Sequence, residues 1–77
     1  MIFKIQYYKI NLEYKAILAL LDFEQIPYIE LGEQISTLKY LRGKPGVAVL
    51  NYDTNELVVD GFYNLVDFIK EKGLRQI

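Results

Sequence analysis

The sequence has 77 residues, and its 9 basic and 10 acidic residues leave a net charge of −1 with no basic stretch, which argues against a nucleic-acid partner. It contains no cysteine and no histidine, which excludes disulfides, thiolate metal sites, thiol nucleophiles and histidine as a general base. The length suits one domain over residues 1–77, and a hydrophobic content of 52% predicts an apolar core.

The N-terminal half predicts a strand, a helix and a second strand. Residues 2–8 place apolar side chains on one face at every second position, as a strand does. Asn11 is a suitable N-cap for a Leu- and Ala-rich helix that ends at about residue 23 or 24. Pro27 belongs to the exit loop, and residues 28–31 follow as a short strand. Strands joined in this way are expected to be parallel, with a right-handed crossover.

The first predicted helix is apolar around most of its circumference. Its apolar side chains are Leu12, Ala16, Ile17, Leu18, Ala19, Leu20, Leu21 and Phe23. Such a helix is either deeply buried within its own fold or covered in part by another chain. The pattern therefore leaves open a homodimer or a complex that is formed through this helix.

The rest of the chain predicts four further elements. They are a helix over residues 33–42, a buried strand over residues 47–50, a returning strand over residues 56–59, and a helix from Phe62 or Tyr63 to Lys72. Gly43 and Gly73 follow the two helices as C-terminal glycines, and Leu74 is placed for a hydrophobic contact with the last turn. Turn residues at 51–55 join the two strands into a hairpin. The elements together predict an α/β domain with a four-stranded mixed sheet.

This order of elements resembles the thioredoxin fold in its short glutaredoxin form, of the phage or bacterial type. Three local matches carry the resemblance: Gln25-Ile26-Pro27-Tyr28 after a Leu/Ala-rich helix, Pro45 before an all-apolar strand, and Val59-Asp60-Gly61-Phe62, which is similar to the Gly-Gly-Phe turn of glutaredoxins. The resemblance implies helices on both faces of the sheet and a cis peptide bond between Lys44 and Pro45. A cis bond there would free the N–H and C=O of Lys44 to pair with an extended peptide.

The resemblance also shows which chemistry is missing. The family's Cys-x-x-Cys falls on residues 11–14, which are Asn-Leu-Glu-Tyr here. An amide and a phenol cannot exchange disulfides, because that reaction needs a thiolate at the helix N-terminus. A glutathione-transferase N-terminal domain is a related comparison, in which Tyr7 or Tyr8 stands near the position that contacts the glutathione sulfur. The large second domain of such transferases is missing, so a residual enzyme is the least favoured alternative.

The resemblance and the residue types together give eight candidate ligand-binding residues. They are Tyr8, Lys9, Asn11, Tyr14, Lys44, Pro45, Asp60 and Gly61. Tyrosines suit a peptide or a planar ligand, the two lysines suit an anion, and the aspartate suits an amine. Each residue also has a structural explanation: tyrosine as core filler, lysine in solvent, Asn11 as N-cap, and Gly61 as the residue that a turn requires. No catalytic residue and no metal ligand is assigned.

Binding is therefore expected in place of catalysis. The cleft between Tyr8–Tyr14 and Lys44–Gly46 would bind a peptide segment of a protein partner or a glutathione-like ligand, and no other cofactor is expected. The alternative is a structural or interaction subunit that pairs through its first helix. Residues 1–10 lack the core of a signal peptide, and no apolar run approaches the roughly 20 residues that span a bilayer. A cytoplasmic location without a membrane partner is thus expected.

Overall fold

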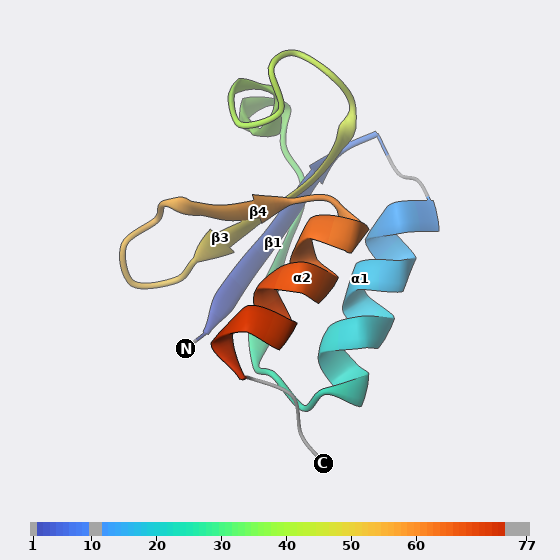
Figure 1. Ribbon diagram of the computed structural model, residues 1–77. Helices are drawn as coiled ribbons and strands as arrows, with labels where there is room; N and C mark the ends of the chain where they lie inside the picture. Colours follow the sequence, from blue (N-terminus) through green and yellow to red (C-terminus); the bar gives the residue numbers. More distant parts are fainter. Residues whose placement is uncertain (1, 10–11, 74–77) are drawn as a thin grey trace.

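The computed structural model describes residues 2–9 and 12–73 as an α/β domain with one sheet and two α-helices (Figure 1). Its elements are β1 (Phe3–Tyr8), α1 (Leu12–Phe23), β2 (Tyr28–Glu33), the 3₁₀ helix η1 (Ile35–Lys39), β3 (Gly46–Asn51), β4 (Leu57–Asp60) and α2 (Phe62–Lys72). The predicted N-cap Asn11 and the predicted helix contact of Leu74 lie outside the described residues. None of the described helices has the length and apolar character needed to cross a membrane.

The four strands form a mixed sheet in the order β2-β1-β3-β4. β1 is parallel to β2 and antiparallel to β3, and β3 is antiparallel to β4. Phe3 in β1 therefore lies opposite Tyr28 on one side and Asn51 on the other. These pairings confirm the predicted parallel strand–helix–strand unit and the predicted hairpin.

One face of the sheet packs against both α-helices and forms the hydrophobic core (Figure 1). The side chains at its centre are Phe3, Ile5, Val47 and Val49 from the sheet, Ile17 and Leu21 from α1, and Leu65 and Ile69 from α2. The strand residues among them alternate along β1 and β3, which is why their side chains share a face. Burying each side chain of this size stabilises the fold by roughly 1.5–3 kcal/mol, so the core fixes how the two helices sit on the sheet.

The other face of β1 meets η1. The side chain of Gln6 alternates away from the core, and its Nε2 donates a hydrogen bond to Thr37 Oγ1 in η1 at 3.0 Å. Both residues are buried, so this bond satisfies two polar groups that have lost water. A polar contact thus anchors η1 to the sheet.

The predicted helix over residues 33–42 is wrong in extent and in type. β2 continues to Glu33, and the helical segment that follows has only five residues, Ile35–Lys39, in a 3₁₀ conformation. The apolar residues of this segment, Ile35 and Leu38, are three positions apart, which is the period of a 3₁₀ helix. Gly43 ends the following turn at φ 80°, where its N–H donates to the Leu38 carbonyl at 2.9 Å.

Most of the apolar surface of α1 is covered within the chain itself. Tyr14, Ile17 and Leu21 are buried, and Leu18 and Leu20 pack partly against the core. The large apolar side chains that α1 exposes stand at its two ends, Leu12 and Phe23. The helix therefore presents separate apolar positions in place of the continuous stripe that its sequence suggested.

Candidate functional site

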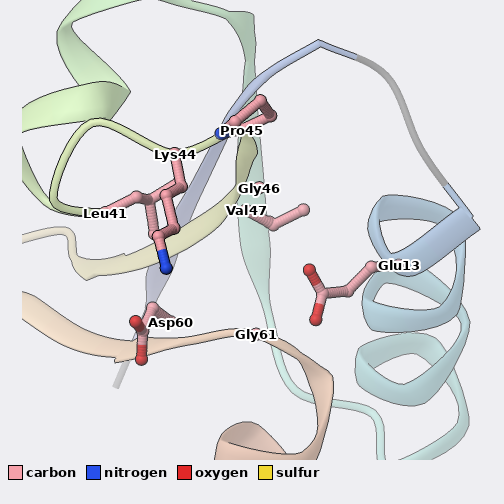
Figure 2. A pocket seen from close by; sticks show the side chains of 8 residues that line it. All are labelled: Glu13, Leu41, Lys44, Pro45, Gly46, Val47, Asp60 and Gly61. Carbon is pink, nitrogen blue, oxygen red and sulfur yellow. The ribbon is translucent and has the colours of Figure 1, made fainter.

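A pocket of about 230 Å³ lies between the loop before β3, the turn before α2 and the first turn of α1 (Figure 2). Four of the predicted site residues line it: Lys44, Pro45, Asp60 and Gly61. The antiparallel pairing of β3 with β4 places the start of β3 beside the end of β4, which brings these two segments together. Half of the eight candidate residues thus lie together at one pocket.

Four further residues line the pocket and were not among the eight candidates: Glu13, Leu41, Gly46 and Val47. Glu13 and Gly46 do fall within the two ranges predicted to border the cleft. Leu41 and Val47 give the pocket apolar walls. Glu13 is the charged residue among them. The sequence signal for Glu13 is its position inside the tetrad over residues 11–14, which corresponds to the family's Cys-x-x-Cys.

Glu13 links the two helices at the pocket. Its Oε2 accepts a hydrogen bond from the backbone N–H of Phe62 at 3.0 Å. Gly61 has a φ of 88°, and a Cβ on it would lie 3.0 Å from the same oxygen. Glycine is thus needed at this position for two reasons. The first is its backbone conformation, which the sequence predicted, and the second is the close approach of the Glu13 carboxylate.

The other two charged residues of the pocket differ in how firmly they are held. Asp60 receives a hydrogen bond from Asn64 Nδ2 on its Oδ1 at 3.1 Å, and the same amide donates to the Asp60 carbonyl at 2.7 Å. Lys44 is exposed, and its ammonium makes no ion pair with any residue that the structure describes. The pocket therefore contains one cation and two carboxylates that do not neutralise one another directly.

The predicted cis bond between Lys44 and Pro45 is wrong, because all peptide bonds between described residues are trans. The N–H of Lys44 donates to the Leu41 carbonyl at 3.2 Å and closes the turn after η1. It is therefore not free to pair with an extended peptide, and that binding mode is overturned. A proline before a strand does not by itself determine the isomer, since trans is the ordinary state of about 94% of such bonds.

Tyr14 lies inside the domain, away from the pocket lining. Its hydroxyl donates a hydrogen bond to the Glu30 carboxylate in β2, and its ring centre lies 4.3 Å from that of Tyr7. Burial, reinforced by the bond to Glu30, raises the pKa of the Tyr14 hydroxyl well above its usual range. The phenol therefore remains neutral and ties α1 to β2, which is the core role that the sequence left open for a tyrosine.

Tyr8 and Lys9 lie at the end of β1 and are not among the pocket residues. The Lys9 ammonium stands 5.8 Å from the centre of the Tyr8 ring, and the Lys9 N–H donates to Glu33 Oε2 at 3.2 Å. Lys9 adopts a left-handed backbone conformation with φ 62°. These two residues form a local cluster with β2, separate from the residues that line the pocket.

No cluster of acidic residues that could hold a metal ion occurs in residues 2–9 and 12–73. No family model, curated protein or solved structure matches this chain. The fold and the site define an α/β domain with a small charged pocket beside the N-terminal ends of its two helices.

Proposed function

We propose that this protein is a thioredoxin-like binding module without redox activity. Its pocket, between Lys44–Gly46 and Asp60–Gly61, would receive part of a peptide segment from a protein partner or of a glutathione-like small molecule. The observation that carries the proposal is a cavity in which three separate segments place charged side chains. One of these is the ammonium of Lys44, which forms no ion pair with any described residue. Charged side chains placed in a cavity in this way suit a polar ligand, because their interactions with the ligand fix its orientation.

The strand arrangement supports the thioredoxin-like part of the proposal. The order β2-β1-β3-β4, with β1 parallel to β2 and antiparallel to β3, agrees with the sheet that the sequence resemblance implies. α1 and α2 share one face, and η1 contacts the other face through Thr37, where the resemblance implies the remaining helix.

The chain cannot catalyse dithiol exchange, because its sequence contains no cysteine. An assay of insulin reduction should therefore give the rate of the blank. Tyr7, one of the two tyrosines considered for a residual enzyme, packs its ring against Tyr14. A binding role uses what the pocket does provide, namely fixed charges and apolar walls.

The size of the pocket limits what it can enclose. Its volume of about 230 Å³ is below the range of roughly 300–1,000 Å³ that is usual for sites that bury a drug-sized ligand. One side chain or one terminal group therefore fills it, and the remainder of a peptide or of glutathione would lie on the surrounding surface. Affinity for a single short ligand is expected to be modest.

Amide chemical shifts of the ¹⁵N-labelled protein test the proposal. Glutathione and a library of short peptides are titrated, and the amides of Gly46, Gly61 and Phe62 are followed. We expect shifts that saturate and that cluster at these amides, and we expect Asp60→Asn to weaken them. Lys70→Gln, on the exposed part of α2, is the matched control and should change nothing. Shifts that are absent, or that are spread evenly over the surface, would contradict the proposal.

Exposed apolar side chains favour a second candidate function, that of an interaction subunit. Leu12 is 84% exposed and Tyr63 is 82% exposed. Leu12 precedes Glu13 and Tyr63 follows Phe62, the two residues whose hydrogen bond joins α1 to α2. A homodimer or a complex with another protein would cover them. Light scattering tests self-association, and the double variant Leu12→Ser, Tyr63→Ser should abolish it. A concentration-independent monomer mass for the unaltered protein would remove the homodimer.

A further inference from the structure

We infer that Glu13 determines the specificity of the pocket, and that the pocket selects a primary ammonium group on an aliphatic stem, as in a lysine side chain. This inference rests on the proposed binding function and names the chemistry of the occupant. It follows from how each charged group in the pocket is held, from the walls between them and from the size of the cavity.

The two negative groups of the pocket are held in place. Glu13 is half-buried, and its Oε2 is fixed by the backbone N–H of Phe62 at 3.0 Å. The Oδ1 of Asp60 is fixed by the side-chain amide of Asn64 at 3.1 Å. Each hydrogen bond uses one carboxylate oxygen, and a carboxylate has a second oxygen that can accept from a ligand. The pocket thus presents negative charge that needs no rearrangement to meet a cation.

The positive group of the pocket is held less firmly. Lys44 is exposed, and no ion pair within the described residues restrains its ammonium. A lysine on a flexible stem of four carbons can turn its charge into water at little cost. An incoming cation can therefore displace Lys44, whereas an incoming anion would still meet two carboxylates, each restrained by one hydrogen bond. This asymmetry favours a cation over an anion.

The walls suit an aliphatic stem. Leu41, Pro45 and Val47 line the pocket with apolar atoms, and the cavity has room for about one side chain. Figure 2 shows the Glu13 carboxylate pointing from α1 toward the space beside Val47 and Gly61. Asp60 and the Lys44 ammonium lie across the pocket from it (Figure 2). A lysine stem packed on the walls would bring its ammonium to these carboxylates.

Three capped tripeptides test the selectivity, each with alanine on both sides of a central lysine, norleucine or glutamate. Their affinities are measured from the shifts of the Gly46, Gly61 and Phe62 amides. We expect the lysine peptide to bind most tightly and the glutamate peptide most weakly. Glu13→Gln should weaken the lysine peptide about tenfold and leave the norleucine peptide unchanged, because hydrogen bonds to charged groups are roughly twice as strong as neutral ones.

Two further variants keep the test independent of the folding role of Glu13. Glu13→Gln retains an oxygen that can accept from Phe62, so the helix contact is conserved. If this variant fails to fold, Asp60→Asn should weaken the lysine peptide in its place. Lys44→Gln should strengthen the binding of the lysine peptide, because it removes the cation that competes for the carboxylates.

The possible results distinguish a failure of the lysine selectivity from a failure of the proposed binding function. A glutamate peptide that binds the pocket more tightly than the lysine peptide would overturn the inference and leave the binding function standing. The same holds if a folded Glu13→Gln protein keeps full affinity for the lysine peptide. If neither glutathione nor any peptide moves the pocket amides, the binding function itself fails.

Discussion

The carboxylate of Glu13, in the first turn of α1, accepts a hydrogen bond from the backbone N–H of Phe62, the first residue of α2. The first N–H groups of an α-helix have no partner within the helix, and Gly61 provides no side chain to cap them. Glu13 performs this capping from a different helix. The same side chain lines the pocket, so the stability of α2 and the charge of the pocket depend on one residue.

Replacing Glu13 by alanine should lower the free energy of unfolding by about 1 kcal/mol, as the loss of a helix cap usually does. Glu13→Gln should cost less, because the amide oxygen can still accept from Phe62. Urea unfolding followed by circular dichroism measures both changes. Glu71→Ala, an exposed carboxylate near the end of α2, is the matched control. Equal losses for the Glu13 and Glu71 variants would show that the bond to Phe62 contributes nothing.

Gly61→Ala should be more destabilising than Gly73→Ala. Both glycines have a positive φ, 88° and 64°, which costs an L-residue roughly 1–2 kcal/mol. At Gly73 an added Cβ would meet open space, whereas at Gly61 it would lie 3.0 Å from Glu13 Oε2 and force the carboxylate aside. Urea midpoints of the two variants give the comparison. A larger loss of stability for Gly73→Ala would mean that the Glu13 carboxylate can move away from the added Cβ without destabilising the protein.

Thr37→Val should destabilise the protein by about 1–3 kcal/mol, because it leaves the buried amide of Gln6 without its partner. The substitution nearly conserves volume, so the loss would report the hydrogen bond and not a cavity. Thr37→Ser retains the hydroxyl and serves as the control. Hydrogen exchange should show faster opening of η1 in the valine variant. Unchanged protection of η1 would indicate that other contacts hold it to the sheet.

The buried hydroxyl of Tyr14 should make stability fall in alkaline solution. Burial and the bond to Glu30 raise the pKa of Tyr14 above its usual value of about 10, so the folded state favours the neutral phenol. This contribution is complete below pH of about 10 and is lost as the pH rises through the folded-state pKa.

Tyr14→Phe should therefore cost about 1 kcal/mol near neutral pH and reduce the alkaline loss. Urea unfolding at several pH values measures both effects. Burial and the bond to Asp22 also raise the pKa of Tyr28, so part of the alkaline loss should persist in the variant. Tyr28→Phe separates the two tyrosines. An alkaline loss that is unchanged by Tyr14→Phe would assign the whole effect to other groups.

The arrangement of the sheet could be predicted from the sequence because its apolar residues repeat with simple periods. The period of two in β1 placed Phe3 and Ile5 on the core face, and the apolar run before Asn51 identified β3. The segment from Ile35 to Lys39 was misassigned because its two apolar residues, Ile35 and Leu38, are three positions apart, a spacing that fits one turn of either helix type. Only the buried contact of Thr37 with Gln6, which joins distant segments, shows how that segment packs.

The site could be predicted only in part. Lys44, Pro45, Asp60 and Gly61 line one pocket, because the hairpin places the start of β3 beside the end of β4. The role of Glu13 could not be predicted, because it depends on the N-terminus of α2 reaching α1, and no local pattern encodes that contact. The geometry of the bond before Pro45 likewise depends on the turn after η1, which the misassigned helix concealed.

The central position of β1 has a consequence for how the chain is made. β1 is synthesised before the other three strands, yet one of its two neighbours, β3, leaves the ribosome after β2 and η1. Until then one edge of β1 exposes unpaired backbone groups, which can pair with other unfinished chains. A two-stranded unit is also too small to be stable by itself. A nascent chain that stalls before Gly46 would therefore be prone to aggregate or to bind chaperones. The exposed edge of β1 is covered once the β3–β4 hairpin has been synthesised and β3 pairs with it.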